Sequence, residues 1–313
     1  MKQFVAKHSP LFILAGLCIF LALYSESFRT SGNLQTVASR TAIIGVIALG
    51  QLLVILTAGI DLSVGSVAAL SGVVGCLAMK SGAPMPVGVL AGCGVGATCG
   101  AINGSLVSKG RIPPFIVTLG MMMAARGLAL RISGGNPVFG LPPSLSVWIG
   151  EGKNWSVPVA IVLALCVIFA IMLAFTRFGR SIYGVGGNRQ AARLSGIPVD
   201  WVLIRAYTLC GLMAGFGGMM LAAKTSIGSP TAAEMYELHT IAACVIGGAS
   251  LMGGEGGAVA SVAGALIMFV LQNFCNLENI DTSWQQVLIG VLIVALVFYD
   301  TMRKRRAGLL KGD

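Results

Sequence analysis

Charged residues are scarce in this sequence. Only 10% of the 313 residues are Asp, Glu, Lys or Arg, whereas about a quarter are charged in a typical soluble domain. The hydrophobic set makes up 56% of the chain, and the mean hydropathy is +0.88. This balance excludes an ordinary soluble domain and predicts an all-α integral membrane protein.

Groups that carry catalysis or bind metals are rarer still. The chain has 11 acidic residues and 2 histidines, and His8 and His239 are far apart in sequence. No paired carboxylates and no nucleophile beside a base can be recognised, so we assign no catalytic residue and no metal ligand. The 8 cysteines fall mostly inside apolar runs without CxxC spacing. That placement favours packing roles over a disulfide framework.

Positive charge is concentrated between the apolar runs. The net charge is +10, and basic residues cluster near Lys2, at 109–111, in a central loop at about 176–201 and in the tail at 302–313. Positive charge flanking a span is retained in the cytoplasm, so these clusters indicate orientation. A nucleic-acid partner is not expected from charge that is distributed in this way.

Ten apolar segments are candidates for membrane spans. They lie at about 11–23, 41–57, 62–79, 87–107, 115–132, 157–175, 202–223, 238–251, 257–274 and 287–299. Six precede the central loop and four follow it, so both termini and the loop fall on the cytoplasmic side. We expect about ten transmembrane helices in one domain over residues 1–313, with an external loop at about 133–156.

The central loop contains a short helical pattern. Good helix formers run from Arg189 to Leu194, Ser195 and Gly196 follow, and Pro198 is a stop signal. The pattern predicts a helix of about two turns that lies outside the bilayer.

Two glycine-rich breaks interrupt the apolar pattern, at 57–66 and 247–257. When the sequence is shifted by 192 positions, Gly65 aligns with Gly257. Such a repeat is typical of a transporter with two related halves and broken helices.

The acids in these breaks are Asp61 and Glu255, and two interpretations stay open. Either Asp61 and Ser63 cap the helix that begins near Leu62 while Glu255 lies in a cytoplasmic turn, or the breaks line or gate a solute path. The candidate path or gate residues are Asp61, Ser63, Gly65, Gly247, Gly248 and Ser250.

Three motifs appear together and in order: Gly59–Ser66 (GIDLSVGS), Gly186–Ile197 and Ile241–Gly254. On these motifs the chain resembles, from about Thr41 to Tyr299, the permeases of ribose-type sugar ABC importers. The run Gln190–Gly196 is similar to the Glu-Ala-Ala, three residues, Gly core through which importer permeases dock to their ATPase. Gln190 stands where that pattern usually has Glu.

The resemblance implies a type II importer permease in the bacterial inner membrane that translocates a monosaccharide such as ribose. It implies a second permease subunit, in a homodimer or a heterodimer, a cytoplasmic ABC ATPase and a periplasmic sugar-binding protein. The ATPase-coupling residues would be Gly187, Asn188, Arg189, Gln190, Ala191, Ala192, Arg193, Leu194, Ser195 and Gly196. No Gly-x4-Gly-Lys-Ser/Thr phosphate loop is present, so ATP and Mg are expected on the ATPase and no cofactor on this chain.

Other functions remain possible at this point. A related permease could carry a branched-chain amino acid, a nucleoside or another small solute. An ion-coupled secondary transporter would need intramembrane acids, for which Asp61 and Glu255 are the candidates. A membrane enzyme is the least favoured class, because no catalytic constellation is present.

Overall fold

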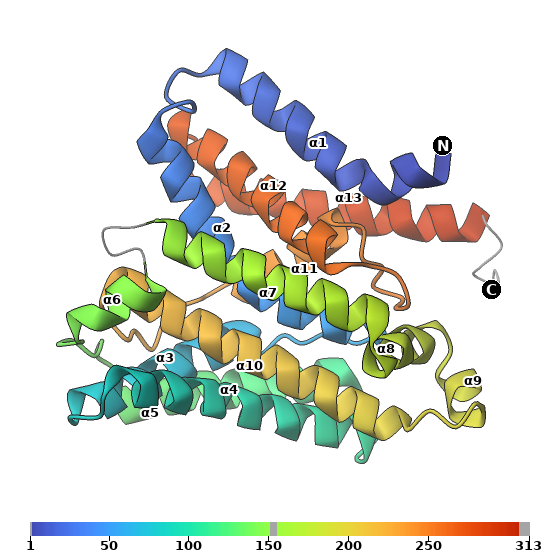
Figure 1. Cartoon of the computed structure of the whole chain (residues 1–313), viewed down its shortest axis with the longest axis horizontal. Coiled ribbons are helices and arrows are strands. Elements are labelled where there is room, and N and C mark those ends of the chain that lie inside the picture. The colour runs from blue at the N-terminus through green and yellow to red at the C-terminus, as the bar shows by residue number, and fades with distance from the viewer. Residues whose placement is uncertain (1, 151–154, 307–313) are drawn as a thin grey trace.

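The computed structural model describes residues 2–150 and 155–306, which form helices joined by loops (Figure 1). Residues 151–154 of the expected external loop and 307–313 of the expected basic tail lie outside the described residues. The helices are α1 (Lys2–Tyr24), α2 (Ser31–Leu56), α3 (Val64–Lys80), α4 (Met85–Ser108), α5 (Pro114–Ser133), α6 (Pro143–Ile149), α7 (Ser156–Phe175), α8 (Arg177–Gly187), α9 (Arg189–Leu194), α10 (Val199–Thr225), α11 (Tyr236–Ile246), α12 (Ala258–Leu277) and α13 (Thr282–Arg306). The predicted all-α fold is confirmed.

Each of the ten predicted apolar segments lies largely within a helix. In the described chain, six helices are long and apolar enough to cross a membrane, namely α2, α4, α5, α7, α10 and α12. The chain is therefore a multi-pass membrane protein, and the number of ten crossings stays a prediction. The eighth segment was expected to reach Leu251, but α11 ends at Ile246. It ends there because two glycines follow, and Gly248 adopts a φ of +85°.

The long helices run between two ends of the molecule, which we name the α9 end and the α6 end after the short helices found there (Figure 1). α7 leads to the α9 end, and α10 returns from it to the α6 end. The start of α1 and the last described turn of α13 both lie toward the α9 end (Figure 1). The first and last described helices and the central loop thus share one end of the molecule, and their placement on one side of the membrane stays a prediction. Which side is cytoplasmic stays a prediction.

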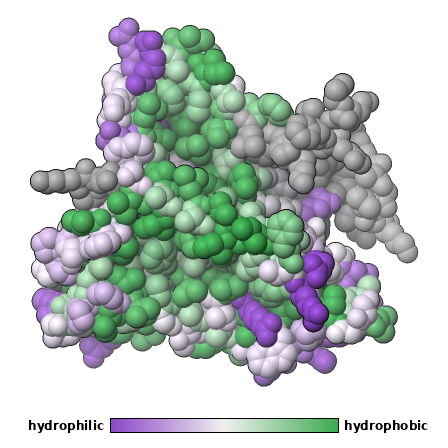
Figure 2. Space-filling view, in the orientation of Figure 1, coloured by the Kyte–Doolittle hydropathy of each residue, from purple (hydrophilic) through white to green (hydrophobic). Residues whose placement is uncertain are grey.

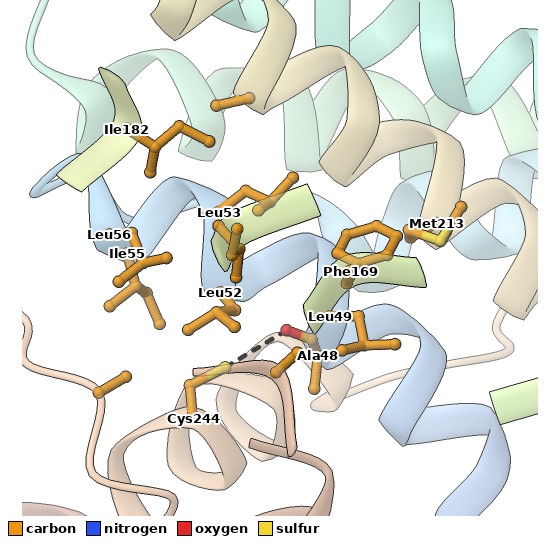
Figure 3. Close-up of a cluster of buried hydrophobic side chains, with 14 of the residues drawn as sticks. Ala48, Leu49, Leu52, Leu53, Ile55, Leu56, Phe169, Ile182, Met213 and Cys244 are labelled. Atoms are coloured by element: carbon orange, nitrogen blue, oxygen red, sulfur yellow. Dashed lines mark hydrogen bonds between the residues drawn. The ribbon is translucent and has the colours of Figure 1, made fainter. Parts of the chain in front are cut away.

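α2 lies at the centre of the helix bundle. All residues from Thr41 to Leu56 are buried, and the helix packs against α7, α10, α11 and α12. Figure 3 shows Leu49, Leu52 and neighbouring side chains of α2 in this core, with the Cys244 thiol of α11 donating to the Ala48 carbonyl at 3.4 Å. Because protein surrounds α2, its position fixes the positions of the helices around it.

α4 and α10 touch backbone to backbone. A Cβ atom added to Gly96 would lie 2.9 Å from the backbone N and Cα of Gly215, and one added to Gly104 would lie 2.7 Å from Cα of Ile204. Gly100, four residues from each, faces the backbone of Tyr207. Lipid supplies no hydrophobic driving force between helices, so close packing of this kind holds membrane helices together.

We expect Gly96→Ala to destabilise the protein by about 1–3 kcal/mol, because the new methyl group overlaps the α10 backbone, which cannot rotate away. Gly94→Ala is the matched control, since a Cβ there has no neighbour within 4 Å. Thermal unfolding of both variants in the same detergent tests the contact. Equal unfolding temperatures for the two variants would contradict it.

Candidate functional site

The central loop forms two helices. α9 spans Arg189–Leu194, as the sequence predicts. Asn188 starts it, because its side-chain oxygen accepts from the N–H groups of Gln190 and Ala191, both at 2.9 Å. This is the side-chain capping that helix starts favour. Because α9 is so short, this cap satisfies a large share of its free N–H groups.

The preceding helix, α8, was missed by the sequence analysis, because its four glycines hide an amphipathic pattern. Ile182 and Val185 are fully buried and pack into the core that contains α2. The Tyr183 hydroxyl donates to the carbonyl of Gly256 at 2.8 Å. α8 is thus anchored to the second glycine-rich break, and it holds α9 in a fixed place.

α9 presents an uncovered surface. Ala192 is 5% exposed, whereas Leu194 is 90% exposed. The other exposed residues of the predicted coupling set are Gly187, Asn188, Arg189, Gln190, Ala191, Arg193, Ser195 and Gly196. The Arg193 guanidinium pairs with Asp200 at 3.0 Å, but both side chains are about half exposed, so the pair adds little stability.

The end of α2 is the point where the two breaks and the central loop meet. The Leu56 carbonyl accepts from the N–H of Gly254 at 3.0 Å. The next carbonyl, of Thr57, accepts from the Arg189 guanidinium at 3.1 Å. Gly186 packs against the same carbonyl of Leu56 and would have no room for a side chain. We call this set, residues 56–57, 253–256 and 186–189, the junction.

The first break folds back into the protein, where Asp61 is 1% exposed. Its carboxylate accepts from the N–H and the hydroxyl of Ser63, at 2.8 and 2.6 Å. The Asn103 amide of α4 donates to the same hydroxyl oxygen at 3.0 Å. In the orientation that satisfies its partners, the Gln51 amide of α2 pairs with both backbone groups of Asp61 at 3.2 Å. The break is therefore held by buried polar groups from α2 and α4.

This geometry corrects the expected cap. Helix α3 begins at Val64, and the Ser63 side chain accepts no hydrogen bond from the first turn of the helix. Asp61 instead stabilises the turn that precedes the helix. Ser63 is 2% exposed, so both side chains lie inside the protein. Glu255 is exposed in the turn of the second break.

The six candidate path or gate residues do not form one cluster. Asp61 and Ser63 share the polar network, while a Cβ on Gly65 would lie 2.5 Å from the Ala233 carbonyl and the Glu237 carboxylate. In the second break Gly247 packs against α12, Ser250 is 1% exposed, and Gly248 is exposed. Their part in a solute path stays a prediction.

A further break, at 226–235, was missed by the sequence analysis. The segment runs alongside α3: Gly228 lies beside Cys76, and Ala233 lies beside Gly65. Those two positions of α3 are about 16 Å apart along the helix axis. α11 follows with 11 residues, which is about 16 Å, or half of the ~30 Å hydrocarbon core. α11 is therefore a half-length helix that begins close to the start of α3.

Arg126 of α5 holds this segment in place. One guanidinium nitrogen donates to the carbonyls of Pro230 and Ala232, at 2.7 and 2.8 Å. Gly228 exchanges two backbone hydrogen bonds with Val138, both at 2.9 Å. Irregular backbone at membrane depth is tolerated only when its polar groups are paired in this way. The sequence signal for this contact is a lone arginine in the middle of an apolar helix.

Broken helices that meet beside an exposed short helix, in a multi-pass membrane protein, are typical of a membrane transport protein. Comparison with known proteins refines this. The family model described as branched-chain amino acid transport system / permease component matches residues 33–297. No solved structure matches the chain.

The chain is 39% identical to the ribose import permease protein of Escherichia coli (strain K12) over 308 residues, covering 97% of this chain and 96% of that protein. It is 40% identical to the ribose import permease protein of Bacillus subtilis (strain 168), covering 96% and 94%. It is 36% identical to the D-allose transport system permease protein of E. coli, covering 95% and 92%. The chain belongs to this family of ABC importer permeases, and the predicted resemblance is confirmed.

We expect Arg126→Met to lower the free energy of unfolding by about 1–3 kcal/mol, because two partly buried carbonyl groups lose a charged donor. Arg131→Met is the matched control, since Arg131 lies exposed in the last turn of the same helix. Thermal unfolding in detergent measures the difference. An equal loss of stability in both variants would mean that the Arg126 contacts are not stabilising.

At the junction, we expect Arg189→Met to lower stability by about 1 kcal/mol, because the Thr57 carbonyl loses its partner. Arg193→Met removes only an exposed ion pair and should cost less than about 0.5 kcal/mol. The unfolding midpoints of the two variants are compared in one detergent. A lower midpoint for Arg193→Met than for Arg189→Met would refute the junction contact.

Proposed function

We propose that this chain is the membrane-spanning subunit of an ABC importer that carries a monosaccharide across the bacterial inner membrane. The observation that carries the proposal is the similarity, over nearly the full length, to permeases named for ribose, allose and fructose. A neutral sugar needs no ionised partner along its path. The small number of acids in this membrane domain is consistent with such a path.

The proposed partners follow from the family and from the exposed helix α9. A cytoplasmic ABC ATPase, which binds ATP and Mg, docks on α9. A second permease subunit, identical or related, completes the path, and a periplasmic sugar-binding protein delivers the solute at the α6 end. Both termini are then cytoplasmic. The Leu194 side chain, at 90% exposure, is the best anchor for the ATPase, because large apolar groups form the centres of protein interfaces.

The proposed coupling runs through the junction. Movement of α9 by the ATPase would pull on Arg189 and, through α8, on Gly256. Both contacts end on backbone carbonyls of the breaks. Because helices α3 and α12 begin directly after these breaks, a displacement there would shift both helices together. Such coupling requires two discrete packings whose balance ATP changes.

ATP-dependent uptake into proteoliposomes tests the function. The vesicles contain this chain, the ATPase and the binding protein encoded beside it, and labelled ribose, allose, fructose and leucine are compared. We expect uptake of one of the sugars that requires ATP. Uptake of leucine alone would support an amino acid permease instead, and uptake driven by an ion gradient without the ATPase would refute the ABC mechanism.

Leu194→Glu tests the docking surface. We expect at least a tenfold loss of ATP-dependent uptake and of ATPase retention during purification, because a charge replaces the apolar anchor, while the unfolding temperature stays unchanged. Phe139→Glu is the control for ATPase retention, since Phe139 is an apolar residue of 59% exposure in the loop at the α6 end, away from α9. Full retention of the ATPase by Leu194→Glu would remove α9 from the docking surface.

A further inference from the structure

A basic groove lies where α8 and α9 meet the start of α10. It encloses about 680 Å³ and is lined by Arg177 and Arg180 of α8, Ile197 of the connecting turn, and Trp201 and Arg205 of α10. The groove thus combines three guanidinium groups with an apolar floor. None of the residues of α9 lines the groove, and the predicted coupling set contributes Ser195 and Gly196 to it.

The three arginines carry unbalanced charge. In the described part of the chain, no acidic group forms an ion pair with Arg177, Arg180 or Arg205. The acid nearest to them in sequence, Asp200, is paired with Arg193. Arg205 is also six residues into α10, which places it about 9 Å along the helix from its first residue. Cations near a membrane surface are attracted by anionic lipid headgroups.

The groove borders an apolar surface of the kind that faces lipid chains. α7 ends at Phe175, which is 77% exposed, and Ile168 and Ile171 on the same helix are more than half exposed. Figure 2 shows hydrophilic surface around α8 and the start of α10 directly beside the hydrophobic surface over α7 and α10. Trp201 is 57% exposed at this border, with the Lys109 ammonium 5.7 Å from its ring. Exposed Trp and Lys are typical of the headgroup level of a membrane.

From this arrangement we propose that the groove binds the phosphate headgroup of an anionic phospholipid, with its acyl chains lying against α7. The charge of the three arginines complements the phosphate, and arginine pairs with phosphate through two parallel hydrogen bonds. Basic pockets between membrane helices bind anionic headgroups in this manner. The proposal does not depend on which solute the permease carries.

The test uses the purified full-length permease alone in detergent, without its ATPase. Thermal stabilisation is titrated with phosphatidylglycerol, phosphatidylcholine and soluble glycerol phosphate, and native mass spectrometry counts the retained lipid. We expect stabilisation by phosphatidylglycerol only. In R180Q/R205Q the half-saturating concentration should rise about 25-fold, which corresponds to about 1 kcal/mol for each arginine. R29Q/R131Q removes the same charge at the α6 end and should bind as the native chain does.

The charge-preserving variant R205K keeps the test decisive if R180Q/R205Q is recovered poorly. R205K should bind within about threefold of the native protein, whereas the single variant R205Q should bind about fivefold more weakly. Equal stabilisation by phosphatidylcholine, by glycerol phosphate or in R180Q/R205Q would overturn the proposal. Retention of the ATPase is measured in a separate co-purification. If R180Q/R205Q lost the ATPase there while its lipid binding was unchanged, the proposal would also be overturned and the groove would be assigned to the ATPase.

Discussion

The structure depends on the free carbonyl groups at the end of α2. The last carbonyls of any helix lack partners within the helix, and no water is available to pair with them inside a bundle. The Leu56 carbonyl accepts from the N–H of Gly254, and the Thr57 carbonyl accepts from the guanidinium of Arg189. A purely local requirement for hydrogen bonds therefore brings together three segments that are far apart in sequence. The proposed route from the ATPase to the membrane helices uses these bonds.

The same requirement explains the charges inside the bundle. Arg126 pairs with the carbonyls of the break before α11, and Asp61 accepts from the turn before α3. Each of these side chains pairs with an irregular segment of backbone that would otherwise carry unpaired polar groups at membrane depth. This structural role weakens the case for Asp61 as the site of a coupling ion, because its carboxylate accepts from both the N–H and the hydroxyl of Ser63, and the residue is only 1% exposed.

Sequence reasoning recovered the features that depend on local patterns. The apolar runs located the long helices, and the helix formers from Arg189 to Leu194 with the stop signal at Pro198 located α9, because such signals act within about one turn. It missed α8 and the break at 226–235, since both are stabilised by distant partners. Ile182 is buried because α7, α10 and α2 surround it, and the break is held by Arg126, about a hundred residues earlier in the chain. The burial of Ser63 could not be predicted from the sequence either, because Asn103, which donates to its hydroxyl, is on α4.

The backbone contact between α4 and α10 limits how this protein can change shape. Where side chains separate two helices, small rotations can be absorbed by changes of rotamer, and intermediate packings exist. Gly96 and Gly215 offer no such freedom, because nothing but backbone lies between the helices. The two helices should thus travel as one body through a transport cycle. The surfaces that slide or open must be those built from longer side chains, such as the exposed face of α5 with Phe115, Leu119 and Met123.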